Sequence, residues 1–329
     1  MVAAIRVRTH GGPEQLVLED TAVPPPGAGE VRIRQTVVGV NFIDVYYRTG
    51  LYPADLPFVP GHEAAGVVVA TGRGVRGFRE GDRVAYLTPT PGAYAAERNV
   101  QARWLVPLPP AIGDAAAAAT ILKGLTAWVL LHRTYRVRRG ETLVVHAAAG
   151  GLGTIMTQWG RSLGAKVIAV VGSDAKAGVA REHGAWETVV LPRDDLAARV
   201  RELTGGAGVP VVYDSVGRDT FFASLDCLRP MGLMVSCGNA SGPVAPFSPQ
   251  ELARRGSLYL TRPGVFHYIA RRGELVRGAR ALFAAIERGV VRVRIGHTYA
   301  LAEAARAHAD LEARRTTGSS VLVIRAGDP

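Results

Sequence analysis

Cysteine and lysine are both scarce in this sequence of 329 residues. Only two cysteines occur, Cys227 and Cys237, so neither a disulfide framework nor a four-cysteine zinc site can be built. All but three of the 39 basic residues are arginine, and the formal net charge is +11. Such an excess favours anionic ligands without requiring a partner. No basic tract is longer than a pair such as Arg138-Arg139, which disfavours a nucleic-acid-binding surface.

Long apolar runs are also missing. No run approaches the roughly 18 residues that a membrane-spanning helix needs, and the opening MVAAIRVRTHGG lacks the apolar core of a signal peptide. We therefore expect a protein that is neither membrane-spanning nor secreted, and we predict a cytoplasmic location. With 48% hydrophobic and 20% charged residues the chain is typical of globular proteins. Its length suggests about two domains of roughly 100–200 residues each.

The first third of the chain is typical of short strands separated by turns. Residues 31–34 alternate apolar and polar side chains with a period of two, as a half-buried strand does. Residues 24–27 and 71–74 are rich in proline and glycine and indicate loops. We expect an antiparallel, barrel-like unit of roughly 110 residues here.

The rest of the chain alternates strands with helices. A strand is expected at 142–146 and a helix at 152–163, followed by a strand at 166–171 and a helix at 174–183. Continuous runs of Val, Ile and Leu indicate strands that are buried on both faces. The predicted fold class is therefore α/β, with a doubly wound parallel sheet after the first unit. Near the end, one long helix is expected at 265–288.

The strongest local motif follows the strand that ends at His146. The next residues, AAAGGLG at 147–153, lead directly into a helix. They match a dinucleotide-binding pattern at Ala148, Gly150 and Gly153, with alanine in place of the first glycine. Small residues let the backbone approach a diphosphate, whose charge then lies at the N-terminus of the helix. The motif predicts a dinucleotide cofactor.

The choice between NAD and NADP depends on a position about 20 residues further along, at the end of the next strand. A carboxylate there favours the 2′-hydroxyl of NAD, but this strand ends in Gly172-Ser173. Lys176 is placed to meet a 2′-phosphate. Asp174 complicates this interpretation, although its ordinary role is in the first turn of a helix, where it opposes the helix dipole. We expect NADP(H).

Two more strand ends, at 211–217 and 235–239, point to the same edge of the expected sheet. In a doubly wound sheet these loops line the cofactor site. Each of their residues is equally compatible with ordinary turn chemistry. Direct contact with a cofactor and a purely structural turn both stay open for this pair of loops.

Together these motifs resemble the NADPH:quinone oxidoreductases, zinc-free members of the medium-chain dehydrogenase/reductase superfamily that are related to zeta-crystallin. The similar segments run nearly from end to end: 41–46, 50–53, 122–126, 146–153, 213–220, 256–263 and 317–320. The resemblance implies a GroES-like β-barrel catalytic domain formed by residues 1–124 and 265–329. It further implies a Rossmann domain of doubly wound parallel sheet at 125–264 that binds NADPH. Family members are usually homodimers or larger, and the matching edge strand is near 257–261.

By motif position, the resemblance also assigns roles to individual residues. Cofactor-binding residues would be Phe42, Ile43 and Asp44 on the nicotinamide side with Thr126 nearby, Gly150, Gly151 and Leu152 at the diphosphate, Ser173 and Lys176 at the 2′-phosphate, and Val216, Cys237, Gly238 and Asn239 in the closing loops. One departure concerns the phosphate: family members often carry a tyrosine where Leu191-Pro192 stands. The strength of that contact therefore stays open.

A zinc ion is the second point of departure. Gly61-His62-Glu63 resembles the zinc motif of the alcohol dehydrogenase relatives, but a catalytic zinc site needs about three converging ligands. Asn41 stands where the first cysteine would be, and both cysteines lie elsewhere. We expect no metal, and we interpret His62 as a turn residue and Glu63 as a polar wall of the cleft.

The expected activity is NADPH-dependent reduction of a quinone. A conjugated acceptor takes hydride directly, so the protein must position it and stabilise charge on its oxygen. Our hydrogen-bond donor candidates are Asn41, Tyr46, Tyr52 and Lys123, although the two tyrosines also fit an aromatic wall. His146 lies on a buried strand and is expected to be a satisfied core histidine rather than a base.

Two alternatives stay open. One is an enone or alkenal double-bond reductase of the same superfamily, which would use the same cleft. The other, of a different class, is a non-catalytic protein that binds NADPH or RNA. Steep weakening by salt would be the signature of RNA binding.

Overall fold

The computed structural model describes residues 1–324. These divide into two compact units. Unit 1 comprises residues 1–125, 269–287 and 293–324, and unit 2 comprises residues 126–268 and 288–292. The expected division at 124/125 and 264/265 therefore differs from these units at residue 125, which lies in unit 1, and at 265–268 and 288–292, which lie in unit 2. The end of the expected catalytic domain, 325–329, lies outside the described residues.

Hydrogen bonds explain why residues 288–292 join unit 2. Gln158 accepts from the Arg292 backbone N–H at 2.9 Å and donates to the Arg292 carbonyl at 3.2 Å. This paired bond fixes the segment to helix α3 (Gly151–Ser162). A spacing pattern in the sequence does not report such a side-chain-to-backbone contact.

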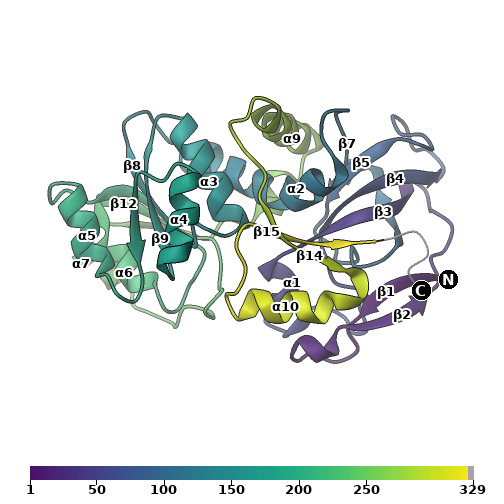
Figure 1. Cartoon of the computed structure of the whole chain (residues 1–329), viewed down its shortest axis with the longest axis horizontal. Helices are drawn as coiled ribbons and strands as arrows, with labels where there is room; N and C mark the ends of the chain where they lie inside the picture. The colour runs from purple at the N-terminus through teal and green to yellow at the C-terminus, as the bar shows by residue number, and fades with distance from the viewer. Residues whose placement is uncertain (325–329) are drawn as a thin grey trace. The chain divides into compact units, whose positions relative to one another are not determined.

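Unit 1 is built on a mainly antiparallel sheet, in the order β14-β15-β3-β4-β5-β7, with β6 paired to β3 (Figure 1). Its strands are β3 (Glu30–Val40), β4 (Glu63–Thr71), β5 (Arg83–Leu87), β6 (Glu97–Gln101), β7 (Leu105–Pro107), β14 (Ile295–Ala300) and β15 (Ser319–Val323). A separate ribbon pairs β1 (Val2–Arg6) with β2 (Val17–Thr21). Val31 and Ile33 are fully buried while Arg34 is exposed, so the alternation at 31–34 marks a half-buried strand as predicted.

The described helices of unit 1 range from 7 to 16 residues in length. They are α1 (Phe42–Arg48), most of α2 (Asp114–Val129), α9 (Arg272–Glu287) and α10 (Ala304–Glu312), with 3-10 turns at Pro13–Gln15, Ala102–Trp104 and Leu301–Glu303. α2 continues as a π-helical turn, Leu130–Thr134. The combined helix Asp114–Thr134 is long and apolar enough to cross a membrane by length and composition, but 72% of its most apolar window is buried inside the protein. That burial is typical of a core helix.

Unit 2 contains a six-stranded parallel sheet in the order β10-β9-β8-β11-β12-β13 (Figure 1). Its strands are β8 (Thr142–His146), β9 (Lys166–Val171), β10 (Glu187–Val190), β11 (Val209–Asp214), β12 (Leu228–Ser236) and β13 (Tyr259–Thr261). Its helices, besides α3, are α4 (Asp174–Glu182), α5 (Leu196–Leu203), α6 (Phe221–Asp226), α7 (Gln250–Arg254) and α8 (Val265–Tyr268). The strand order reverses between β8 and β11, which is the Rossmann switch point. The predicted α/β fold class is confirmed.

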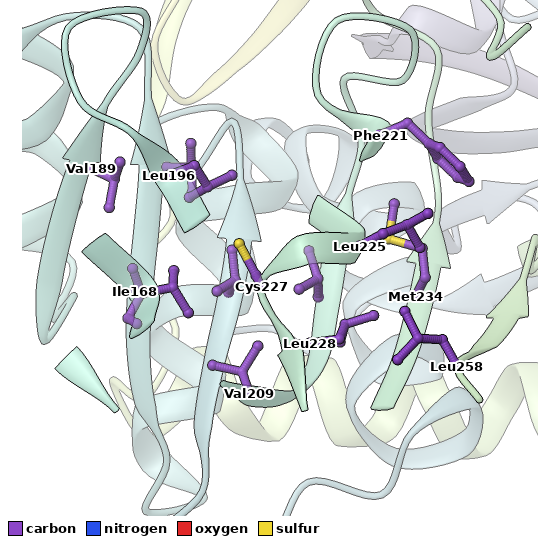
Figure 2. Packing of buried hydrophobic residues seen from close by; sticks show 14 residues of the cluster. Ile168, Val189, Leu196, Val209, Phe221, Leu225, Cys227, Leu228, Met234 and Leu258 are labelled. Carbon is purple, nitrogen blue, oxygen red and sulfur yellow. The ribbon is translucent and has the colours of Figure 1, made fainter. Parts of the chain in front are cut away.

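The core of unit 2 explains why its strands are continuous apolar runs. Figure 2 shows side chains from β9, β10, β11 and β12 meeting side chains from α5 and α6. Ile168, Val189 and Met234 come from strands, and Leu196 and Leu225 come from helices. All of them are at most 3% exposed. Because helices cover the sheet, its strands carry few polar residues.

Candidate functional site

The turn between β8 and α3 requires glycine at one position and leaves another open. A Cβ on Gly153 would lie 2.3 Å from the Ala147 carbonyl oxygen and 2.5 Å from the Ala148 Cα. That is the close packing of helix against strand for which the dinucleotide motif uses glycine. A Cβ on Gly150 would meet only the Ala147 oxygen, at 3.2 Å. The N-terminus of α3 is therefore tightly packed at Gly153 and accessible at Gly150.

The same turn holds a strained residue. Ala147 has a φ of +48°, in the left-handed region that costs a residue with a Cβ roughly 1–2 kcal/mol. Hydrogen bonds fix it there: Gly150 N–H donates to the Ala147 carbonyl at 2.9 Å, and Ala148 N–H donates to the Val170 carbonyl at 3.2 Å. Gly150, Gly151 and Leu152 are all partly exposed. The backbone N–H groups at the start of α3 are thus held in place for an anionic ligand.

Ser173 and Lys176 come together at the N-terminus of α4, where β9 ends. The Ser173 hydroxyl oxygen accepts from the Lys176 backbone N–H at 3.3 Å, so serine caps the helix. Asp174, in the first turn, is paired with Arg193 at 2.9 Å. Arg193 was not singled out from the sequence. Its only sequence signal is the general rule that an arginine near this strand end can receive a 2′-phosphate.

The loops after β11 and β12 press against each other. Buried Asp214 accepts from the backbone N–H groups of Val216 at 2.8 Å and Gly217 at 3.0 Å. The Cys237 N–H donates to the Asp214 carbonyl at 2.7 Å. A Cβ on Gly238 would lie 2.3 Å from the Ser215 carbonyl oxygen. These contacts fix the positions of both loops.

Arg262 follows β13 (Tyr259–Thr261) and contacts the loop after β12, although the sequence analysis did not assign it to the site. Its guanidinium donates to the Gly238 carbonyl at 2.9 Å and to the Ser236 hydroxyl at 3.1 Å. The Asn239 carbonyl accepts from Gly242 N–H at 2.9 Å. Burial raises the pKa of the Cys237 thiol to about 12, so that residue stays protonated at neutral pH. The loop residues are suited to shape a binding surface, not to act as nucleophiles.

His146 is buried, as predicted, but only half satisfied. Its Nε2 lies 2.9 Å from the Ser224 hydroxyl, which donates to Asp214 at 2.8 Å. Among the described residues, nothing pairs with its Nδ1. Burial lowers its pKa, so the ring is neutral at neutral pH. The expectation of a fully satisfied core histidine is wrong in this respect.

In unit 1, two side chains and one backbone N–H that lie far from Glu63 in the sequence donate hydrogen bonds to its carboxylate. Glu63 Oε1 accepts from Asn41 Nδ2 at 2.8 Å and from Lys123 Nζ at 3.0 Å, and Glu63 Oε2 accepts from the Leu122 N–H at 2.6 Å. Glu63 is fully buried, and the Lys123 side chain is 9% exposed. Glu63 is therefore the buried partner of two donor candidates. The interpretation of Glu63 as a polar cleft wall is wrong, because the lysine and the amide hold it inside.

The residues around Glu63 do not fit a catalytic zinc ion. Both oxygens of Glu63 already accept hydrogen bonds, and one faces the ammonium of Lys123. His62 lies in a bend just before β4, in line with its interpretation as a turn residue, but it is buried, and its Nδ1 lies 2.9 Å from the Thr88 carbonyl. Within residues 1–324, no three His, Cys, Asp or Glu side chains are grouped closely enough to hold a metal ion.

Asp44 is fully buried beneath Asn41. Its Oδ2 accepts from the Asn41 backbone N–H at 2.9 Å and from the Tyr94 hydroxyl at 3.1 Å. His308 Nε2 lies 3.0 Å from the same hydroxyl. Burial is the largest cause that raises the pKa of Asp44 to about 7; the nearby charge of Glu63 adds to this, while the two hydrogen bonds oppose it. Its hydrogen bonds fix the carboxyl at the start of α1, and its role on the nicotinamide side stays a prediction.

Asp44 makes the stability of the fold depend on pH. Its carboxyl loses a proton near 3.8 in the unfolded chain and at about 7 in the folded one, so a rise in pH between these values favours unfolding. We expect Asp44→Asn to remove this contribution, measured as the difference in unfolding free energy between variant and wild type across that range. Burial lowers the pKa of His308 to about 3, so a fall in pH below about 6.5 favours unfolding through this residue. Both proteins contain His308, so subtracting the unfolding free energy of wild type from that of the variant isolates the contribution of Asp44. A constant difference would contradict the prediction.

The aromatic residues of the site form one packed group. Tyr46 and Tyr52 have ring centroids 5.2 Å apart and an interplanar angle of 61°, and Phe42 lies 6.2 Å from Tyr46. The Tyr52 N–H donates to the Tyr46 carbonyl at 3.0 Å. Tyr46 is 7% exposed, while Phe42, Ile43 and Tyr52 are half-buried. The arrangement fits an aromatic wall.

The sequence-predicted site residues thus fall into two sets, each described within its own unit. The set in unit 1 consists of Asn41, Phe42, Ile43, Asp44, Tyr46, Tyr52 and Lys123. The set in unit 2 consists of Gly150, Gly151, Leu152, Ser173, Lys176, Val216, Cys237, Gly238 and Asn239, with half-buried Thr126 at its first residue. Their roles in binding and catalysis stay predictions.

Comparison with known proteins finds family matches in both units and relatives that align over nearly the whole chain. Residues 27–110 match the alcohol dehydrogenase GroES-like domain, and residues 151–269 match the zinc-binding dehydrogenase family. A quinone oxidoreductase from Pseudomonas aeruginosa is 51% identical, covering 98% of this chain and all of the relative. A 2-haloacrylate reductase from a Burkholderia species is 44% identical, covering 99% of this chain and all of the relative.

Solved structures agree. Escherichia coli quinone oxidoreductase complexed with NADPH is 45% identical and superposes with a TM-score of 0.96, covering 98% of this chain and 99% of that one. The similarity extends through both units. The chain belongs to the quinone oxidoreductase family of the medium-chain dehydrogenases/reductases.

Proposed function

We propose that this protein is an NADPH-dependent quinone oxidoreductase. The observation that carries the proposal is the rigid turn at Gly150, which leaves the N-terminus of α3 accessible, together with the cationic strand end at Lys176 and Arg193. Full-length similarity to quinone oxidoreductases, one of them complexed with NADPH, supports the same conclusion.

The residues of unit 2 fit the dinucleotide. We assign the diphosphate to the N–H groups of Gly150, Gly151 and Leu152, because a Cβ at Gly150 would occupy the space that the ligand needs. Ser173 and Lys176 are assigned to the 2′-phosphate. The closing loops, with Val216, Cys237, Gly238 and Asn239, are held by Asp214 and Arg262. When bound, NADPH supplies the hydride.

The residues of unit 1 are assigned to binding the quinone that accepts the hydride. Asn41 and Lys123 each keep N–H groups beyond those that they give to Glu63, so both are assigned as donors to the quinone oxygen that gains charge. Tyr46 and Tyr52 are assigned to the aromatic wall along the quinone ring. His62 is unsuited as a base, because burial lowers its pKa to about 4. Positioning and hydrogen bonding are then the main contributions of the protein.

Steady-state assays test the proposal. NADPH oxidation by the purified protein should be fast with 1,4-benzoquinone and much slower with 2-chloroacrylate or an alkenal. The 2-haloacrylate reductase relative makes double-bond reduction the second candidate. Turnover of the alkene substrates with no rate on any quinone would select that candidate. No turnover of either class, with NADPH still bound, would indicate a non-catalytic binding protein.

We also propose a homodimer that forms through strand β13. This strand is the edge of the parallel sheet, and its Tyr259 and Leu260 are 62% and 39% exposed. Tyr259→Arg should shift the sedimentation coefficient to that of a monomer. Val17→Arg, at an exposed apolar residue of unit 1, is the control and should leave the dimer intact. A wild-type monomer would exclude this interface.

The cytoplasmic location expected from the sequence stays a prediction.

A further inference from the structure

We propose that Arg193 determines specificity for NADPH by exchanging its ion pair with Asp174 for the 2′-phosphate of the cofactor. This inference rests on the proposed function, since it concerns the same cofactor. It assigns a role to a loop where the family's usual tyrosine is replaced by Leu191-Pro192.

The loop after β10 holds the Arg193 side chain in a fixed direction. Arg193 Nε donates to Asp194 Oδ1 at 2.9 Å. The other oxygen of Asp194 accepts from the Val190 backbone N–H at 2.8 Å, so the carboxylate itself is anchored to the end of the strand. The guanidinium is therefore tethered at its Nε edge by Asp194 and reaches Asp174 at the start of α4.

The outer edge of the guanidinium has donors to spare. Arg193 Nη1 donates to both oxygens of Asp174, at 2.9 and 3.1 Å. Among the described residues, none accepts a hydrogen bond from Nη2. An arginine presents five N–H donors in a plane that matches a phosphate. Two of these donors are available without breaking any contact, and the Nη1 donors become available when Asp174 is released.

The parallel register puts Arg193 on the loop beside the position that distinguishes NADP from NAD. Val190 is paired with Val171, so the loops after β10 and β9 leave the same edge of the sheet side by side. Ser173 and Lys176 follow β9, and Arg193 follows β10. The carboxyl end of β9, the second strand of the Rossmann sheet along the chain, is where the 2′-position of the adenosine ribose is recognised. Arg193 and Lys176 would hold the phosphate from two sides.

Electrostatics favours the exchange. Asp174 alone would repel a phosphate, and its pairing with Arg193 neutralises it. The side chains of the pair are 59% and 79% exposed, so water screens the ion pair and it is easily broken. A phosphomonoester carries about −1.5 to −2 charge at pH 7 and competes well with a single carboxylate. NADH lacks the 2′-phosphate, so with NADH bound the ion pair between Arg193 and Asp174 stays intact.

The test compares NADPH and NADH binding by fluorescence titration in wild type, Arg193→Ala, Asp174→Asn and the double variant. We expect Arg193→Ala to weaken NADPH about 10–100-fold, as the loss of hydrogen bonds to a charged group does, and to leave NADH within about 2-fold. Asp174→Asn should strengthen NADPH several-fold. Arg199→Ala, which removes an exposed arginine of α5 paired with Glu187 and Glu202, is the matched control and should change neither affinity.

The double variant separates direct contact from neutralisation. If Arg193 binds the phosphate, the double variant stays weak for NADPH, because removing Asp174 cannot replace the lost donors. If Arg193 only neutralises Asp174, the double variant binds NADPH like wild type, and the inference is overturned. Equal weakening of NADPH and NADH by Arg193→Ala would overturn it as well. A wild-type protein that binds neither cofactor would instead refute the proposed function.

Discussion

Gly150→Val is expected to abolish the binding of NADPH and NADH alike while the protein stays folded. The backbone at Gly150 has a φ of −82°, which any residue adopts, and a Cβ there would meet only one carbonyl oxygen, at 3.2 Å. The valine methyl groups would instead occupy the space in front of the α3 N–H groups, where the diphosphate is assigned. With two or more hydrogen bonds to a charged group lost, the affinity should fall at least about 100-fold.

Two variants serve as controls for this result. Gly150→Ala should weaken binding less than valine, because it adds a single methyl group. Gly153→Ala should lower the thermal stability, since its Cβ would lie 2.3 Å from a backbone oxygen. Fluorescence titration gives the affinities, and thermal unfolding shows which proteins are folded. Wild-type affinity in a folded Gly150→Val protein would mean that the diphosphate binds elsewhere.

The glycine turn was predictable because its information is local. A buried strand, a run of small residues and a helix follow one another within about twenty residues, and each has a recognisable pattern. The same holds for the parallel sheet of unit 2, whose strands are apolar throughout. The helix expected at 265–288 shows the limit. The structure has two helices there: α8 ends at Tyr268, and α9 begins at Arg272. A turn in which the Arg271 carbonyl accepts from the Glu274 N–H starts the second helix.

The polar pairs of the site were not predictable, because they join residues far apart in the chain. Glu63 meets Lys123 sixty residues later, and Tyr94 meets His308 at a separation of 214 residues. A histidine or glutamate in a sequence does not disclose whether it is buried or which donor faces it. Asp44 was expected on the nicotinamide side, and no pattern in the sequence indicated that its carboxyl accepts a hydrogen bond from Tyr94, fifty residues later. Patterns located these segments, and only tertiary packing gives the direction of each side chain.

Removing either member of the Glu63–Lys123 pair should destabilise unit 1 by about 3–5 kcal/mol. Both side chains are buried, and the loss of one leaves the other charge without compensation. We expect this cost for Glu63→Gln and for Lys123→Met, measured as the unfolding free energy in urea. Arg79→Met, which removes the exposed partner of Asp82, is the control and should cost at most about 1 kcal/mol. A cost that small for either buried residue would contradict the prediction.

The double variant Glu63→Gln/Lys123→Met distinguishes a structural role of this pair from a catalytic one. With both charges gone, much of the lost stability should return, because no unpaired charge is left in the interior. Activity should not return with it. If Lys123 donates to the quinone oxygen, loss of that donor lowers kcat by about 100–1000-fold whether or not the fold is restored. Recovery of both stability and kcat would mean that Lys123 serves only to neutralise Glu63, and that Asn41 is the donor that remains.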